Sequence, residues 1–219
     1  PYNLILSFII GAIVLVGSVL ISIFSTKEYS PEELAQFSDE KPASEKESSL
    51  FDVIDDFRQM PSTMRQLAFV QFFSWFGLFG MWVFTTPAIA HHIYGLPISD
   101  NSSDAYQNAG DWVGVLFGVY NLVSAIYAFA LPYIAQQIGR KSTHAISLII
   151  GGLGLISIYF APNEDFLILS MVAVGIAWAS ILSMPFAILA GSISPFKMGV
   201  YMGIFNFFVV LPQIVNALI

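Results

Sequence analysis

Residues 166–190 read FLILSMVAVGIAWASILSMPFAILA and include no charged side chain. The apolar residues surround the predicted helix instead of forming one stripe, which is not the pattern of a surface helix in a soluble protein. The stretch also exceeds the ~20 residues that an α-helix needs to cross the hydrocarbon core of a bilayer. We therefore predict a membrane-spanning helix at residues 166–190.

Five further apolar stretches of similar length lie along the chain. They are residues 2–24, 66–90, 112–135, 144–160 and 199–219. Of the 219 residues, 56% are hydrophobic and 11% are charged, whereas soluble domains carry about 25% charged residues. Lipid offers the backbone no hydrogen-bond partners, so spanning segments must be helices or a closed barrel, and a barrel would show alternating hydrophobicity. The predicted fold class is an all-α, multi-pass membrane protein.

The positive charges predict how these helices are oriented. All eight Lys and Arg residues lie in the first, third and fifth connections: Lys27, Lys41, Lys46, Arg58, Arg65, Arg140, Lys141 and Lys197. Loops rich in Lys and Arg stay on the cytoplasmic side, most reliably when they are short. We therefore expect the odd-numbered connections to be cytoplasmic in a protein of the plasma (inner) membrane, with the lipid bilayer around the helices.

Several kinds of cofactor and partner have no support in the sequence. A basic stripe for nucleic acid is missing, and the absence of cysteine excludes disulfides and thiolate metal sites. His91-His92, Asp100 and Asp104 could be drawn as a metal site, but adjacent histidines in a loop rich in Gly, Pro and Ser are more commonly solvent-exposed. We expect no metal, no cofactor and no nucleic acid, and the oligomeric state stays open.

The polar segment of residues 25–64 contains two helix signals. Residues 30–33, Ser-Pro-Glu-Glu, have the pattern of a capping box with Pro at the first helical position and predict a short helix through Phe37. Apolar residues recur at helical spacing from Leu50 to Phe57, opposite acidic residues. They predict an amphipathic helix on the cytoplasmic face or against the bundle, with a solvated connector as the alternative.

Several motifs resemble a known family. They are MP at 60–61, QFFSW at 71–75, GRK at 139–141, AWASILSMPFAILAG at 177–191 and GVYMGIFNFF at 199–208. Together they resemble the sucrose/maltose branch of the major facilitator superfamily, which includes plant sucrose:proton symporters and bacterial relatives. The resemblance implies helices six to eleven of a twelve-helix bundle. Residues 1–24 would be the last helix of the N-terminal bundle, 25–64 the cytoplasmic central loop, and 65–219 five of the six helices of the C-terminal bundle.

Neutral polar and aromatic residues are the candidate substrate ligands, because no Asp, Glu, Lys or Arg lies deep in a predicted span. Gln71, Trp75, Trp82 and Thr86 repeat at helical spacing on one face. Amides and hydroxyls can bind sugar hydroxyls, and aromatic rings stack on the C–H faces of a sugar. This face therefore suits a neutral sugar better than a charged metabolite. The alternative is that Trp75 and Trp82 are lipid-facing or interfacial anchors.

Later spans contain further candidate substrate ligands. They are Tyr120, Asn121, Ser124, Trp178, Asn206 and Gln213. By the resemblance, Asn121 falls where plant relatives carry an Asn in a Leu-Asn-Ser motif. Deep amides such as Asn206 and Gln213 are costly unless they face a cavity or a partner helix, so bonding between helices is the alternative.

Asp111 is the candidate coupling residue. Plant relatives carry an Arg-acid pair where this chain has Trp112-Val113, which leaves Asp111 as the only carboxylate nearby. A carboxylate in a cleft could exchange protons. The alternative is that Asp111 caps a helix that begins at Trp112.

Gly139, Arg140 and Lys141 resemble the cytoplasmic end of the superfamily's repeated loop motif. In that motif the glycine permits a tight turn, and the cations engage helix C-termini and acidic partners at a cytoplasmic gate. This chain has Gln136-Gln137 where the motif has an acidic residue.

Regularly spaced glycines predict close contacts between helices. They are Gly110, Gly114 and Gly118, Gly199 and Gly203, and the pair Gly77 and Gly80. Small residues let backbones approach in lipid, where packing drives helix association. The alternative is that these smooth faces slide during a transport cycle.

Together these features predict a secondary active transporter and not an enzyme. Its substrate would be a neutral sugar, a disaccharide such as sucrose or maltose, moved by alternating access with proton symport. The alternatives are a polytopic membrane enzyme and a non-transporting membrane sensor or scaffold. An enzyme would need a deep nucleophile, a metal cluster or an acid pair, and the sequence supplies none.

Overall fold

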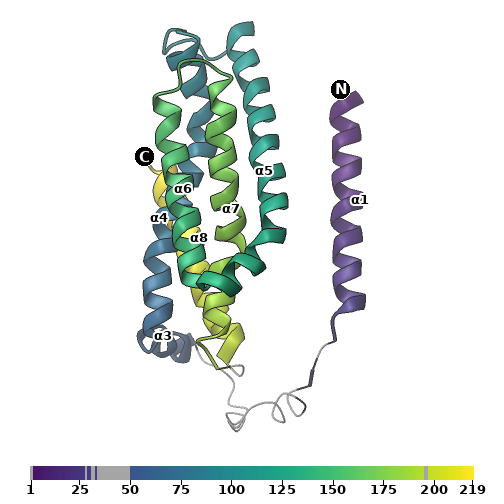
Figure 1. The fold of residues 1–219 in the computed structure, drawn as a ribbon, viewed down its shortest axis with the longest axis vertical. Coiled ribbons are helices and arrows are strands. Elements are labelled where there is room, and N and C mark those ends of the chain that lie inside the picture. Colours follow the sequence, from purple (N-terminus) through teal and green to yellow (C-terminus); the bar gives the residue numbers. More distant parts are fainter. Residues whose placement is uncertain (1, 28, 31–32, 34–49, 195–196) are drawn as a thin grey trace. The chain divides into compact units, whose positions relative to one another are not determined.

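The computed structural model describes residues 2–27, 29–30, 33, 50–194 and 197–219. Its helices are α1 (Tyr2–Ser25), α3 (Leu50–Arg58), α4 (Ser62–Ala88), the π-helical turn η1 (Ile89–Ile93), α5 (Asp104–Ile138), α6 (Arg140–Tyr159), α7 (Phe166–Ala190) and α8 (Met198–Ala217). Contacts divide the chain into two units, Pro1–Lys46 with α1 and Glu47–Ile219 with α3 to α8 (Figure 1). Among the described residues, six helices are long and apolar enough to cross a membrane, which confirms the six predicted spans.

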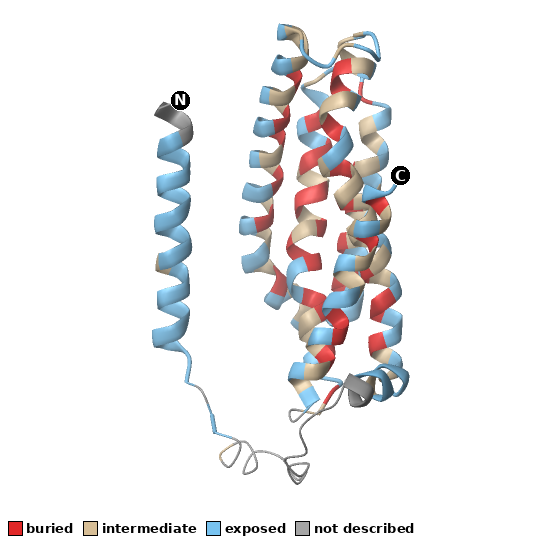
Figure 2. Ribbon diagram, turned by 180° about the vertical axis from the view of Figure 1, so that it is seen from behind, coloured by how far each residue is buried: buried red, intermediate tan, exposed pale blue. Residues whose placement is uncertain are grey.

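The first unit contains a single apolar helix, α1. Nearly every described side chain of α1 is exposed (Figure 2). Its serines bond within the helix: the Ser18 hydroxyl donates to the Leu15 carbonyl over 2.8 Å, and the Ser22 hydroxyl donates to the Ser18 carbonyl over 3.0 Å. A helix that satisfies its polar groups internally and exposes apolar side chains all round is suited to lipid.

The capping box after α1 is present in the structure. The Ser30 amide donates to the Glu33 carboxylate over 3.0 Å, and the Glu33 amide donates to the Ser30 hydroxyl over 3.3 Å. This reciprocal pair of bonds is the geometry that the sequence predicted. The rest of the predicted helix through Phe37 lies outside the described residues.

In the second unit, α7 packs closely on both α5 and α6, and α4 packs on α8. The close approach depends on glycines of α6 and α7. A Cβ added at Gly154 would lie 2.7 Å from the Ala173 Cβ, and one added at Gly175 would lie 2.6 Å from the Tyr120 carbonyl oxygen. Since real Cβ atoms do not approach this closely, hydrogen is the only substituent that fits without a backbone shift.

The close helix contacts predicted from glycine spacing are present only in part among the described residues, at Gly77, Gly80 and Gly110. The positions where an added Cβ would meet no heavy atom within 4 Å include Gly114, Gly118, Gly199 and Gly203. Only Gly80 among the predicted glycines is tight, with the Asn216 amide nitrogen 3.2 Å from the added Cβ. Spacing identifies a smooth stripe on a helix, but it does not say which neighbour the stripe faces.

Two predicted span boundaries are corrected by the structure. α5 begins at Asp104, eight residues before Trp112, because the Ser103 hydroxyl accepts the Tyr106 amide at 3.2 Å and caps an earlier first turn. α4 ends at Ala88, but η1 follows it directly and extends the helical segment to Ile93, past the predicted end at Ala90; Pro87 lies in the last turn of α4. Proline removes one backbone donor, and a π-turn lets the helix continue with a shifted hydrogen-bond pattern.

The predicted amphipathic helix is present as α3. It contacts α8 through a stacked ring pair, Phe57 and Phe208, with centroids 6.0 Å apart. Its Asp56 accepts a 2.6 Å hydrogen bond from Lys197, the residue before α8. Packing against the bundle is therefore favoured over a solvated connector, although the side chains of Val53 and Ile54 stay exposed.

Candidate functional site

Four aromatic side chains from three helices form one cluster in the second unit. They are Trp75 and Trp82 of α4, Tyr120 of α5 and Trp178 of α7. The Trp178 ring stands edge-on to all three others, with centroids 5.6 Å from Trp75, 5.4 Å from Trp82 and 6.4 Å from Tyr120. The Trp82 indole N–H donates to the Tyr120 hydroxyl over 3.1 Å. We call these four residues the aromatic cluster.

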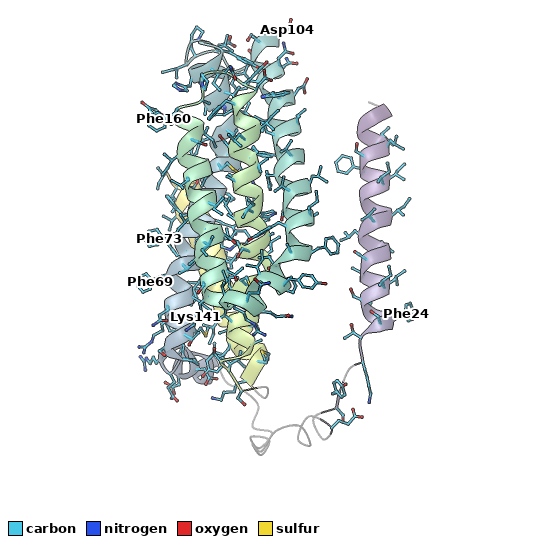
Figure 3. The ribbon with its side chains drawn as sticks, in the orientation of Figure 1. Phe24, Phe69, Phe73, Asp104, Lys141 and Phe160 are labelled. Carbon is cyan, nitrogen blue, oxygen red and sulfur yellow. The ribbon has the colours of Figure 1, made fainter. Side chains whose placement is uncertain are left out.

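The positions of Trp75 and Trp82 bear on whether these rings are substrate ligands or membrane anchors. Both rings are partly buried and pack against the core formed by α4, α5 and α7. Rings that anchor a helix in the interface would project outward, as the exposed Phe69 and Phe73 do (Figure 3). The anchor interpretation of Trp75 and Trp82 therefore does not fit their packing.

Unpartnered polar atoms lie on the same face of α4. Gln71 is fully buried, and neither its Oε1 nor its Nε2 has a hydrogen-bond partner. One turn later, the buried Nε1 of Trp75 also has none. Each such group costs about 1–3 kcal/mol, and polar atoms of this kind mark places where water or a ligand binds.

The other predicted ligands are more scattered. Tyr120 and Ser124 are buried, whereas Thr86 is only partly buried and its neighbour Thr85 faces the core. The Thr85 hydroxyl donates to its own helix at Met81. Thr85, and not Thr86, is thus the buried threonine of this turn.

Three predicted amides lie outside the aromatic cluster. Asn121 and Asn206 are exposed, on α5 and α8 respectively. The Asn121 amide donates to the Phe117 carbonyl over 2.8 Å, and the Gln213 amide donates to the Val209 carbonyl over 3.0 Å. Both bonds stay within one helix, so they do not join neighbouring helices.

Asp111 does not cap a helix, which corrects one of its two interpretations. It lies two turns inside α5, whose first residue is Asp104, and its side chain is exposed. The sequence placed the helix start at Trp112 because hydropathy begins there. Hydrogen bonding and capping, which decide where a helix begins, extend beyond the apolar stretch.

Sequence reasoning missed the buried His144, whereas Asn216 is a deep amide of the last span for which bonding between helices was the expected alternative. His144 is 4% exposed, and its Nδ1 lies 2.8 Å from the Ser180 hydroxyl, while its Nε2 is buried without a partner. Asn216 donates to the Phe76 carbonyl over 3.2 Å and so joins α8 to α4. In the sequence, His144 is the first residue of the apolar stretch 144–160, and nothing there indicates that it is buried. Only the neighbouring α7 shows that it is buried.

The predicted turn at Gly139 is present, and it positions Arg140. Gly139 has φ +85°, a backbone conformation that favours glycine. Arg140 donates from Nη1 to the Ala187 carbonyl over 2.8 Å, in the last turn of α7. A cation at a helix C-terminus is favourable because the unpaired carbonyls are there. Lys141 is exposed beside it.

At the opposite end of the second unit, Glu164 joins the residue after η1 to α5. The Tyr94 hydroxyl donates to its carboxylate, and the Trp112 indole donates to its carbonyl over 3.2 Å. The histidines of the predicted loop bond elsewhere: His91 Nδ1 lies 3.0 Å from the Leu96 carbonyl, and the ring of His92 stacks on another aromatic side chain. Among residues that the structure describes, no three His, Asp or Glu side chains converge on a metal-binding geometry.

The Tyr94–Glu164 bond predicts how stability depends on alkaline pH. This hydrogen bond, together with burial and the carboxylate charge, raises the pKa of Tyr94 to about 12. Because the pKa rises above its unfolded value of about 10, the neutral phenol stabilises the folded state fully below pH ~10 and loses this effect towards pH ~12. The difference in melting temperature between the natural protein and Tyr94→Phe should be constant from pH 7 to ~9.5 and then shrink. Tyr133→Phe, at an exposed tyrosine, should show no such difference.

Comparisons with known proteins agree with this architecture. The family model described as Major Facilitator Superfamily matches residues 3–216. The chain is 25% identical over 241 aligned residues to a sucrose transport protein, SUT2, of Oryza sativa subsp. indica, and 24% identical to the SUT2 of subsp. japonica. Each alignment covers 99% of this chain and 47% of the relative, so the chain spans about half the length of the curated relatives that it matches. No solved structure matches it.

These findings confirm the resemblance that the motifs indicated. The six spanning helices and the family model together identify an integral, multi-pass membrane protein. Both relatives are named as sucrose transport proteins. From residue 3 to residue 216, this chain belongs to the Major Facilitator Superfamily.

Proposed function

We propose that this chain is part of a secondary active transporter that moves a neutral sugar, a disaccharide such as sucrose or maltose, by alternating access. The observation that carries the proposal is the aromatic cluster beside the unpartnered amide of Gln71 and indole N–H of Trp75. Aromatic faces can stack on sugar rings, while an amide and an indole N–H can bind sugar hydroxyls. The sucrose transport proteins among its relatives support a sugar as the substrate class.

Proton symport is the coupling that we propose. Asp111, Gly114, Gly118 and Asn121 recur at helical spacing along one exposed face of α5. We infer that this face borders the transport path, where a carboxylate could exchange a proton with water. The Gly139-Arg140-Lys141 turn would then act as a gate, because Arg140 already holds the end of α7.

The proposed division of the chain is that of a transporter with two helix bundles. Residues 1–24 would close the N-terminal bundle, residues 25–64 would connect the bundles, and residues 65–219 would supply five helices of the C-terminal bundle. The contacts assign α3 to the second unit, so the connection would be partly fixed to the C-terminal bundle.

The function is tested by reconstituting the intact protein in liposomes and measuring uptake of radiolabelled sucrose and maltose. We expect uptake that increases with an inward proton gradient and counterflow when unlabelled sugar is loaded inside. Counterflow of another solute without any sugar flux would overturn the substrate class. Sugar binding without flux would instead support a sensor, and chemical conversion of the sugar would support an enzyme.

The proposed orientation gives a second prediction. This chain has no cysteine, so a single one can be introduced at Ser142, next to the basic turn, or at Ser99, in the loop without Lys or Arg. Both serines are exposed. Because basic loops stay cytoplasmic, a membrane-impermeant maleimide should label Ser99→Cys in intact cells and label Ser142→Cys only after permeabilisation. The reverse pattern would contradict a cytoplasmic location of Arg140 and Lys141 at the plasma membrane.

A further inference from the structure

A cleft opens between α4 and α6 at the end of the second unit where both helices begin. It has a volume of about 210 Å³. The residues that matter here are Thr63, Gln66, Val70, Lys141, His144 and Leu148. We call this the basic-end cleft, and Lys141 marks its position at the start of α6 (Figure 3).

Two helix N-termini border the basic-end cleft. α4 begins at Ser62 and α6 at Arg140, and Thr63 and Lys141 from their first turns line the cleft. Neither helix has a side-chain N-cap bond, and neither has an acidic residue in its first turn. The positive ends of two helix dipoles, with first-turn amides that no side chain caps, therefore lie at the mouth of the cleft, which favours an anion.

A buried histidine provides an independent indication of a ligand. His144 is 4% exposed and lines the cleft, and its Nε2 has no hydrogen-bond partner. Its Nδ1 lies 2.8 Å from the Ser180 hydroxyl. If that hydroxyl donates to Nδ1, the neutral ring carries its hydrogen on Nε2 and can donate it to an acceptor. A buried donor without a partner is costly unless something binds it.

The remaining wall of the cleft is apolar. Val70 and Leu148 continue from the polar mouth along helices that are long enough to cross the membrane. An inorganic ion would bind at the polar mouth of the cleft and would not contact this apolar wall. A molecule with an anionic head and a hydrocarbon tail would use both parts, and basic pockets between membrane helices recognise such lipids.

We propose that the basic-end cleft binds one anionic phospholipid. Its phosphate lies at the N-termini of α4 and α6 beside Lys141, and an acyl chain follows Val70 and Leu148. His144 donates from Nε2 to an oxygen of the headgroup or of the ester linkage. With the proposed orientation the cleft opens in the inner leaflet, where anionic lipids attract Lys and Arg. Lipid binding itself does not depend on sugar transport.

The test measures lipid binding by the intact protein in detergent. Binding is detected by native mass spectrometry and by the change in melting temperature. The probes are dioleoyl phosphatidylglycerol, dioleoyl phosphatidylcholine and inorganic phosphate. We expect a clear preference for phosphatidylglycerol. Lys141→Gln should weaken it about fivefold, as expected for a loss of about 1 kcal/mol for each Lys near an anionic surface, and His144→Phe should weaken it as well. Arg58→Gln, an exposed cation outside the cleft, is the matched control and should leave binding unchanged.

Several results would overturn the lipid site. Equal binding of the two lipids, or equal losses in Lys141→Gln and Arg58→Gln, would show that the cleft does not recognise the headgroup. Stabilisation by inorganic phosphate alone would show that it binds a free anion. A benzophenone amino acid at Leu148 provides a further arm: a crosslink to lipid supports the proposal, and a crosslink to a polypeptide helix contradicts it. Because Lys141 is exposed, its substitution should not impair folding.

Discussion

Replacing Trp178 by alanine is expected to reduce the initial rate of sugar uptake on the order of 10- to 100-fold. Each aromatic pair contributes about 0.5–1.5 kcal/mol, and a free energy of about 1.4 kcal/mol corresponds to a tenfold change. The Trp178 ring contacts all three other members of the aromatic cluster. Removing it leaves Trp75 and Trp82 without their partner on α7. The measurement is sucrose or maltose uptake into liposomes that contain equal amounts of folded protein.

Two further variants separate sugar binding from folding. Trp178→Phe retains an aromatic ring and should retain a larger part of the uptake. Trp112→Phe changes a tryptophan at the Glu164 end of the unit, outside the aromatic cluster, and should leave uptake close to that of the natural protein. Normal uptake by a correctly folded Trp178→Ala protein would remove the aromatic cluster from the proposed sugar site.

Gly175→Ala is expected to have the largest effect on stability. The added Cβ would lie 2.6 Å from the backbone oxygen of Tyr120 and 2.8 Å from the Val123 Cβ. A backbone oxygen cannot rotate away as a side chain can, so α5 and α7 must separate, at a cost of about 1–3 kcal/mol. The melting temperature of the protein in detergent should therefore fall by several degrees. Uptake should fall with it, because Tyr120 and Trp178 belong to the aromatic cluster.

Gly152→Ala is the matched control for that substitution. Gly152 also lies in a spanning helix, but an added Cβ there would meet no heavy atom within 4 Å. Alanine is a better helix former than glycine by about 0.8–1 kcal/mol. The melting temperature of Gly152→Ala should therefore stay the same or rise. A fall of equal size in both variants would show that the α5–α7 contact is not the cause.

The existence and approximate position of the six spans could be predicted from sequence, because hydropathy over some 20 residues is a local property of the chain. The ends were harder to predict. α5 begins at Asp104 because of a hydroxyl cap at Ser103, although the residues before Trp112 are too polar to mark a span. Hydropathy shows which residues can lie within the membrane, whereas capping decides at which residue the helix begins.

The candidate site was predictable only in part. The spacing of Gln71, Trp75 and Trp82 placed them on one face of a helix, and the structure keeps them there. The partner rings on α5 and α7 come from positions 38 to 103 residues further along the chain than Trp82 or Trp75. No local pattern reports such distant pairs. For the same reason, the burial of His144 and the helix contacts at Gly154 and Gly175 could not be predicted from the sequence.

The sequence by itself determined that this chain contains six membrane-spanning helices and that its Lys and Arg residues lie in the first, third and fifth connections, because lipid accepts only apolar, internally bonded segments. The tertiary structure alone decided which helix faces meet. Close helix contacts form at Gly154 and Gly175 and not at Gly114 and Gly118, and the Trp178 ring lies against both tryptophans of α4. The physical reason is that a helix in lipid can turn an apolar face towards lipid or towards another helix without a hydrophobic penalty. The partner of each face is then decided by close packing between segments far apart in the chain.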